Sequence, residues 1–480
     1  MKVQFRPAVW TAFACFSGFG TAQTALPDLG TGSYLGQQGG LYPGGANQPP
    51  AAHAAAALGE AAQVVPRDTA GNPDPDGLIG MVCLGMSNTS QEFEDLERTL
   101  DARTARNPHL VIVNTCAGGQ SAELMDQASD LYWSTLAPGR LAAAGVATKQ
   151  VQVAWMKQAF GSPQDPGFPG HAQALRDTLK SVVQVARATY PNLRLLYVSS
   201  RIYGGFVTVQ PGSEPFTFET GFGVKWLIEA QIGGDVALNH DSARGPVLAP
   251  LLLWGPYLWA NGGTPNGNGT TWTTGDYEAD HLHPSTSGEA KVGALLTAFF
   301  DAEPSATWLA QAHDAALRIV PTEADAYVDA AQPDANFGTA ASLAVLGGAQ
   351  PKRVLLRFSI GGVGPALLHA KLVVRDVNTG LNPVVRLVGD TAWSEAGVTW
   401  NTAPAVDGAT LSSGSNWTRE NCPSFDLTAA LRNDADGRIT VAIDTPAATE
   451  QQIYSRESTL PPQLVLSIAV TDRVFFDGFE

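Results

Sequence analysis

The sequence has 480 residues, and 44% of them are hydrophobic, so disorder along the whole chain is excluded. Its length predicts two or three domains that each bury a sizeable core. Acidic residues outnumber basic ones by 45 to 29, which gives a formal net charge of −16. Long-range attraction to nucleic acid or to anionic lipid is therefore not expected.

The segment 1–22 follows the pattern of a secretory signal peptide. Lys2 and Arg6 come before an apolar stretch rich in small residues at 7–20, and Ala22 suits the cleavage site. No other segment reaches about 18 consecutive apolar residues, so no membrane span is predicted. The sequence thus predicts a secreted protein, extracellular or periplasmic.

The next segment, 23–77, is rich in Ala, Gly, Pro and Gln and has no sustained periodicity. This composition predicts a disordered or low-complexity linker.

Three cysteines remain after the signal peptide: Cys83, Cys116 and Cys422. Cys83 and Cys116 lie in neighbouring predicted strands, so a disulfide between them is one alternative. Their spacing resembles neither a zinc site nor a disulfide framework, and small buried hydrophobes are the favoured interpretation.

Between residues 78 and 303, apolar runs alternate with amphipathic stretches. The runs that predict buried strands are 78–84, 110–113, 151–156, 193–198 and 247–254. Helical spacing is found at 172–188 and 222–232, and a capping-box pattern from Thr286 to Glu289 begins a last helix. Strands that alternate with helices predict a parallel α/β sheet.

A short linker is expected at 304–317. After it, the pattern of apolar residues along the sequence changes. Short apolar runs separated by Gly, Asn, Asp and Pro occur at 342–346, 353–360, 371–377, 438–443 and 463–470. Many short strands without helices between them predict a β-sandwich over 318–471. Residues 472–480 form an aromatic tail, interpreted as a sorting tag or an extra edge strand.

A serine follows the first predicted strand, where Gly85 leads through Met86 to Ser87 and a helical pattern begins. Parallel sheets bind ligands at the carboxyl ends of their strands, and the N–H groups of a helix start can stabilise an oxyanion. Because a turn serine is more often only a helix cap, Ser87 needs further support as a nucleophile.

The support comes from two later segments. The second strand ends at Asn114 and is followed by a turn containing Gly119, where backbone amides can approach a reacting carbonyl. Near residue 283, Asp280 and His283 offer a general base with an orienting carboxylate.

The spacing of Asp280 and His283 is not unique. Glu278 and His281 share it, and about one such pair is expected by chance in this chain. Pro284 and the capping box favour His283, because they fix it in a loop that enters the last helix.

These pieces, in this order, resemble the SGNH (GDSL-like) hydrolases, whose blocks are Gly-Asp-Ser, a strand ending in Asn before a Gly-containing turn, and Asp-x-x-His-Pro. The resemblance covers 78–303 and implies a flavodoxin-like parallel sheet and a serine esterase that needs no cofactor and no metal ion. It implies Ser87 as nucleophile, His283 as base, Asp280 as the third triad member and Gly119 as an oxyanion donor.

The sequence departs from this family pattern at two positions. Met86 stands where the family usually has Asp, so the nucleophile turn must be braced by other groups. The third-block Asn is missing, and Trp155-Met-Lys-Gln resembles, displaced by one residue, the Trp-x-Gln of carbohydrate O-acetylesterases in the same superfamily. Gln158 is the expected third oxyanion donor, with Lys157 as the alternative; both could instead be solvated loop residues.

The second block resembles the DNRLRE-type β-sandwich modules of secreted bacterial proteins, some of which bind carbohydrate. The matching stretches are 324–329, 334–339, 353–358, 390–395, 398–404 and 454–457. Trp393 and Trp400 are expected in the core rather than stacked on sugars, because a sandwich must fill its interior with large side chains. The sequence leaves open the ligand of this block and any bound calcium.

Together these features predict a secreted serine esterase that removes acyl groups, O-acetyl foremost, from carbohydrate. The expected partners are an ester-bearing carbohydrate or small ester at the first block, and polysaccharide at the second. The second block is expected to fold independently and to contribute binding alone. The alternatives are a lipid or small-ester hydrolase, or a non-catalytic polysaccharide-binding protein with a decayed hydrolase domain.

Overall fold

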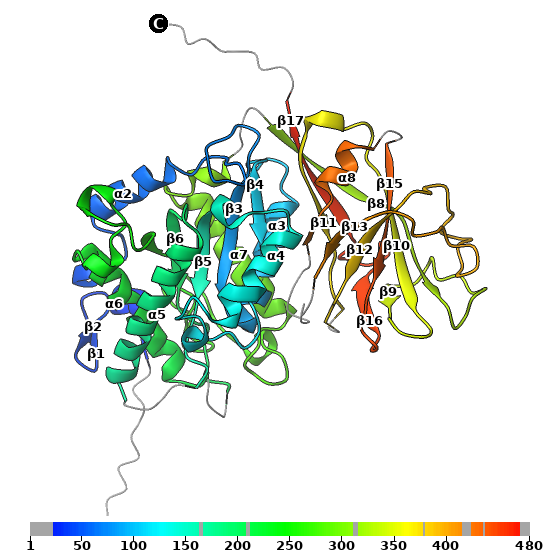
Figure 1. The fold of residues 1–480 in the computed structure, drawn as a ribbon. Helices are drawn as coiled ribbons and strands as arrows, with labels where there is room; N and C mark the ends of the chain where they lie inside the picture. The colour runs from blue at the N-terminus through cyan, green and yellow to red at the C-terminus, as the bar shows by residue number, and fades with distance from the viewer. Residues whose placement is uncertain are drawn as a thin grey trace, which may run out of the picture.

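The structure, a computed structural model, describes residues 23–162, 167–207, 212–310, 315–377, 380–414, 424–434 and 437–470. The expected signal peptide, Cys422 and the aromatic tail lie outside these ranges. The described chain forms an α/β domain and a β domain that pack side by side (Figure 1). Among the helices described, none has the length and apolar character needed to cross a membrane.

The α/β domain is built on the five-stranded parallel sheet that the sequence predicts. Its strands are β3 (Ile79–Gly85), β4 (Leu110–Val113), β5 (Val151–Lys157), β6 (Leu195–Ser199) and β7 (Leu251–Trp254). Their order is β4-β3-β5-β6-β7, and each neighbouring pair is parallel. This order confirms the flavodoxin-like topology. Every residue of these strands is buried, which explains the continuous apolar runs in the sequence.

Helices cover both faces of this sheet and create two cores. On one face α3 (Ser87–Asp101) and α7 (Thr286–Ala302) bury their apolar sides with Trp155 of β5. On the other, α5 (Gly170–Thr189), α6 (Phe216–Ile232) and the shorter α4 (Ala137–Ala143) pack with Met156. The capping box predicted at Thr286 is not formed: Ser285, one residue earlier, is the N-cap, and its hydroxyl accepts from the N–H of Gly288, which has no side chain to return a bond.

The segment 23–77 is ordered, so its prediction as a disordered linker is wrong. It contains α1 (Leu26–Leu29), β1 (Ser33–Tyr34), β2 (Gln37–Gln38) and α2 (Ala51–Ala61). Individual residues of this segment contact the edge strand β7. The Trp254 indole N–H donates to Leu41 O at 2.6 Å, and the Trp254 backbone N–H donates to Tyr42 Oη at 3.1 Å. Contacts made one residue at a time leave no periodic pattern in a sequence.

Cys83 and Cys116 form a disulfide, with their Cα atoms 5.4 Å apart. Treating them as unpaired small hydrophobes was therefore wrong. They become neighbours because β3 and β4 are adjacent in the sheet, a fact that cysteine spacing alone does not contain.

The β domain is antiparallel, in agreement with the predicted all-β class. Its strands are β8 (Ala315–Asp329), β9 (Ser342–Val345), β10 (Lys352–Ser359), β11 (Leu367–Val373), β12 (Val384–Val388), β13 (Thr410–Ser413), β14 (Ser424–Asp426), β15 (Arg438–Asp444), β16 (Gln451–Tyr454) and β17 (Gln463–Ala469). Eight of them form one sheet in the order β13-β12-β15-β10-β8-β17-β11-β14, and β16 pairs with β9.

Apolar side chains from both sheets of the β domain, such as Leu356 of β10 and Leu343 of β9, fill its main core. A smaller core on the outer face of β8 holds Trp393, which is 7% exposed, with Trp400 partly buried against it. Trp393 is thus a core residue, as predicted. The helix α8 (Thr428–Arg432) closes one end of the domain.

The remaining helical segments are short. They are η1 (Pro43–Gly45), η2 (Ala122–Leu124), η3 (Tyr132–Leu136), η4 (Thr148–Gln150), η5 (Val236–Leu238), η6 (Ser242–Arg244), η7 (Thr274–Asp276), η8 (Thr307–Leu309) and η9 (Gly364–Ala366).

The described parts of the expected linker 304–317 are packed rather than free. Trp308 and Leu309 are buried against the α/β domain, and the Asn107 side chain donates to Trp308 O at 3.0 Å. Residues 315–317 already belong to β8. The sequence did not predict this packing, because two apolar residues in a short segment are too few to show helical or strand periodicity.

A buried ion pair network joins the two domains. Lys371 of β11 is 2% exposed, and its ammonium group donates to Glu97 at 2.6 Å, to Asp101 at 2.7 Å and to the backbone O of Ile112 at 2.8 Å. Glu97 and Asp101 belong to the last turns of α3. The β domain therefore contacts the α/β domain through buried ion pairs. The expectation that it forms an independent module did not include such a contact.

Candidate active site

The candidate site lies at the carboxyl ends of β3 and β5. The chain leaves β3 toward β4 on one side and reaches β5 on the other, so the crevice between β3 and β5 is where this topology binds ligands. Ser87 follows β3 directly and is the first residue of α3. The first-turn N–H groups of a helix have no intrahelical acceptor, so the start of α3 can receive a negative charge beside the Ser87 hydroxyl.

The turn that carries Ser87 is held by side chains of neighbouring strands and loops. The Asn114 amide donates to Ser90 O at 2.9 Å and accepts from the Ser90 hydroxyl at 3.1 Å. The Thr89 hydroxyl donates to Lys157 O at 2.7 Å. At Gly85 a Cβ atom would lie 2.6 Å from Lys157 O, so only glycine allows β3 and β5 to approach here. These groups supply the bracing that Met86 cannot.

The structure brings the predicted Ser87, His283 and Asp280 together. Ser87 Oγ lies 2.9 Å from His283 Nε2, and His283 Nδ1 lies 2.6 Å from Asp280 Oδ2. The carboxylate favours the tautomer with the proton on Nδ1, which leaves Nε2 to accept from the serine hydroxyl. The three side chains thus have the hydrogen-bond order that a base-activated serine requires.

Asp280 also fixes the loop that presents His283. Its Oδ1 accepts from the backbone N–H groups of Leu282 at 2.9 Å and His283 at 3.0 Å. Burial alone would raise the pKa of Asp280, but the hydrogen bonds from the His283 ring and from these N–H groups outweigh it and lower the pKa to about 2. The carboxylate therefore stays charged over the whole range in which an imidazole titrates.

The alternative pair, Glu278 and His281, is not assembled. Nδ1 of His281 has no hydrogen-bond partner within the described chain, and His281 has a backbone φ of +56°. Its backbone N–H donates to Glu278 O at 2.9 Å, so the two residues meet only through the main chain of a tight turn.

Gly119 lies in the turn after β4 with φ of +73°, and a Cβ atom there would have no neighbour within 4 Å. Gly119 itself is exposed, and its neighbours Gly118 and Gln120 are half-buried. The positive φ is a conformation that glycine adopts without strain, which explains glycine at this position.

Gln158 does not lie in the position expected of an oxyanion donor. It is 1% exposed, and its amide N–H groups donate to Gln120 O and to Met125 Sδ, both at 2.8 Å. Because both hydrogen bonds from its amide group go to Gln120 and Met125, Gln158 stabilises the loop that follows Gly119. The interpretation of Gln158 as a solvated loop residue is equally wrong.

Lys157 is also buried, contrary to the solvated alternative. Its ammonium group pairs with Glu92 of α3 at 2.5 Å, and both residues are at most 1% exposed. Burial lowers the pKa of Lys157 to about 8 and raises that of Glu92, while their mutual attraction opposes both shifts. This ion pair ties β5 to α3 beneath the serine.

Sequence reasoning missed Arg201, which follows β6 at the same edge of the sheet. Its side chain is buried, its Nε has no hydrogen-bond partner within the described residues, and burial lowers its pKa despite the attraction of Glu92. It lines a small cavity of about 20 Å³ with His171 and Gly212. The available signal was its position directly after a buried strand.

The comparisons with known proteins bear on the β domain. Residues 318–468 match carbohydrate-binding module family 96. This match agrees with the resemblance to sandwich modules seen in the sequence, and it gives the C-terminal domain a carbohydrate-binding class.

A curated relative also names a polysaccharide. A "Gellan lyase" from Bacillus sp. is 32% identical over 167 residues, which is 32% of this chain. The matched part spans only 7% of the length of that relative. The likeness therefore associates part of this chain with a polysaccharide-active protein and transfers no reaction.

Among solved structures, a Ruminococcus gnavus GH29 fucosidase mutant in complex with fucose aligns over 85% of this chain and 96% of its own. The identity is 9% and the TM-score is 0.16, so this alignment carries no argument about fold or function.

Proposed function

We propose that the protein is a secreted serine esterase that hydrolyses acyl esters, O-acetyl foremost, on carbohydrate. The observation that carries the proposal is the hydrogen-bonded chain Ser87–His283–Asp280 at the start of α3. The carbohydrate-binding match of the C-terminal domain supports a saccharide as the carrier of the ester.

The arrangement suits a two-step acyl transfer. His283 Nε2 takes the proton of the Ser87 hydroxyl as Oγ attacks the ester carbonyl carbon, and Asp280 stabilises the imidazolium that forms. The first-turn N–H groups of α3 and the turn at Gly119 receive the negative charge on the carbonyl oxygen. The imidazolium then gives its proton to the departing sugar oxygen, leaving an acyl group on Ser87.

Water completes the reaction. His283 removes a proton from a water molecule, which attacks the acyl carbon, and Ser87 leaves with its proton restored. The products are the free acid and the deacylated carbohydrate. No cofactor enters any step of this sequence.

We expect the purified chain to release acetate from p-nitrophenyl acetate and from an acetylated polysaccharide. The reason is that Ser87 and His283 are already at hydrogen-bond distance. The measurement is product release followed by absorbance and by acetate quantification, with the same polysaccharide after chemical deacetylation as the blank. Binding of the polysaccharide without release from either ester would favour the non-catalytic alternative, and release from p-nitrophenyl acetate alone would favour a small-ester hydrolase.

The pH dependence of hydrolysis should identify the base. Asp280 keeps its charge down to about pH 2, so a fall of kcat/KM on acidification from neutral pH should come from protonation of the base and not of Asp280. His283→Ala should lower kcat on the order of 10³-fold or more, whereas His281→Ala should change it far less. A pH–rate profile and the two variants measure this, and the reverse ranking would move the base to His281.

A further inference from the structure

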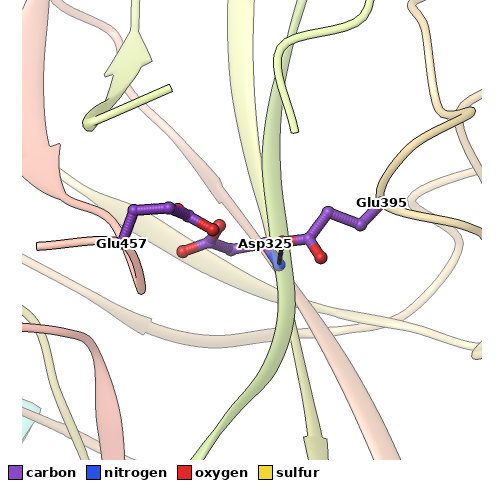
Figure 2. A group of neighbouring side chains, drawn as sticks. All are labelled: Asp325, Glu395 and Glu457. Carbon is purple, nitrogen blue, oxygen red and sulfur yellow. Dashed lines mark hydrogen bonds between the residues drawn. The ribbon is translucent and has the colours of Figure 1, made fainter. Parts of the chain in front are cut away.

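Three carboxylates from distant parts of the chain meet beside β8, where Asp325 lies on the same face of the sheet as Leu356 of the main core. Asp325 lies in β8, Glu395 in the connection between β12 and β13, and Glu457 just after β16. Figure 2 shows the Asp325 side chain between the other two. One oxygen from each residue lies within 4.8 Å of the corresponding oxygens of the other two, and in the described chain no other such group of metal-ligating side chains occurs.

Asp325 contributes an unsatisfied oxygen to this cluster. The residue is 0% exposed, and its Oδ2 accepts from the Arg456 backbone N–H at 2.7 Å. Its Oδ1 is buried and has no hydrogen-bond partner anywhere in the described residues. A buried acceptor without a donor is destabilising, more so when it is charged, and so calls for a ligand.

The charge of the cluster is only partly balanced. The Arg456 guanidinium approaches Glu395 at 2.9 Å and Glu457 at 3.1 Å. Three carboxylates and one guanidinium leave two negative charges when all are ionised. Burial and the repulsion of Glu457 and Glu395 raise the pKa of Asp325 to about 7, so the cluster as it stands resists full ionisation.

We propose that Asp325, Glu395 and Glu457 form a binding site for a calcium ion. A ring of carboxylate oxygens without nitrogen or sulfur is the donor set of a hard divalent cation. Calcium binds oxygen at about 2.3–2.6 Å, so two oxygens on one ion are at most about 5 Å apart, as the cluster provides. The two uncompensated charges match the charge of the ion.

A bound ion would link the connection between β12 and β13, which contains Glu395, to β8. Glu395 already holds this connection to β8 by accepting from the Asp325 N–H at 3.1 Å, and the Asn336 side chain donates to Glu395 O at 2.8 Å. Trp393, which fills the small outer core, lies two residues before Glu395. Calcium bound here therefore stabilises the packing of Trp393 on the outer face of the β domain.

The test is calcium titration of the full chain after treatment with EDTA. We expect one calcium ion to bind by isothermal titration calorimetry, with a Kd on the order of 10⁻⁴ M or tighter, and to raise Tm in differential scanning calorimetry.

Glu457→Gln should weaken calcium binding by at least about tenfold and abolish the rise in Tm. Glu450→Gln is the matched control: Glu450 is 38% exposed and pairs with Lys352, as Glu457 is 33% exposed beside Arg456, but it lies outside the cluster. The control should bind calcium like the native chain. Absence of calcium binding by the native chain, equal binding by Glu457→Gln, or tighter binding of Mg²⁺ than Ca²⁺ would overturn the proposal.

Discussion

Replacing Ser87 with alanine should lower kcat for ester hydrolysis by at least about 10³-fold, with little change in KM. In the proposed mechanism the hydroxyl oxygen attacks the ester, so its loss removes the covalent step and leaves only the residual effect of the N–H groups around it. Initial rates of p-nitrophenyl acetate hydrolysis measure the effect. Because the Ser87 side chain is only half-buried and its hydroxyl bonds to His283 rather than to the core, the fold should be retained.

The control for this experiment is Ser181→Ala, which removes a surface serine hydroxyl from α5. It should leave kcat unchanged. Circular dichroism and Tm should be the same for both variants and the native chain. If Ser87→Ala keeps full activity, Ser87 is not the nucleophile and the proposed mechanism is wrong.

Lys371→Met should lower the free energy of unfolding by about 3–5 kcal/mol. Methionine keeps the apolar stem but removes the ammonium group that Glu97 and Asp101 share, so buried carboxylates lose their partner. Burial would lower the pKa of Lys371, but the attraction of these two acids outweighs it and raises the pKa, which keeps the group charged. Urea unfolding of the full chain, followed by circular dichroism, measures the change.

Lys352→Met is the matched control, because Lys352 pairs with Glu450 and Asp329 but is 19% exposed. Ion pairs in contact with water contribute about 0–1 kcal/mol, so this variant should change stability little. Equal effects of the two variants would show that water reaches Lys371 and that the domains are loosely joined. The expected difference would show that the ion pairs of Lys371 between the two domains contribute to the stability of the full chain.

The elements that the sequence predicted well are those whose pattern is local. Strands such as β4, fully buried and bounded by turns, appear as apolar runs, and Leu110–Val113 was predicted with its observed bounds. The errors concern packing between distant segments. Leu41 docks on β7 and Cys83 bonds with Cys116, and neither contact can be inferred before the order of the strands is known.

The same distinction holds for the candidate site. Ser87, Asp280 and His283 were predicted because they lie in short motifs whose order resembles that of a known hydrolase family, and the structure places them at hydrogen-bond distance. Gln158 was predicted from its place after β5 and from the likeness, displaced by one residue, of Trp155-Met-Lys-Gln to the Trp-x-Gln of carbohydrate O-acetylesterases. The position of a residue along a strand does not show which way its side chain points. The Gln158 side chain points inward, to the backbone O of Gln120.

Helix α3 starts at Ser87 and reaches the C-terminal domain through Glu97 and Asp101. Its 15 residues form a rod of about 22 Å. Under the proposed function, a saccharide held by the C-terminal domain is therefore presented to the serine at a constant separation. If the two domains were joined only by a flexible linker, the linker length would set the effective concentration of the saccharide at the serine. Here α3 instead fixes the separation between Ser87 and the part of the C-terminal domain that holds Lys371.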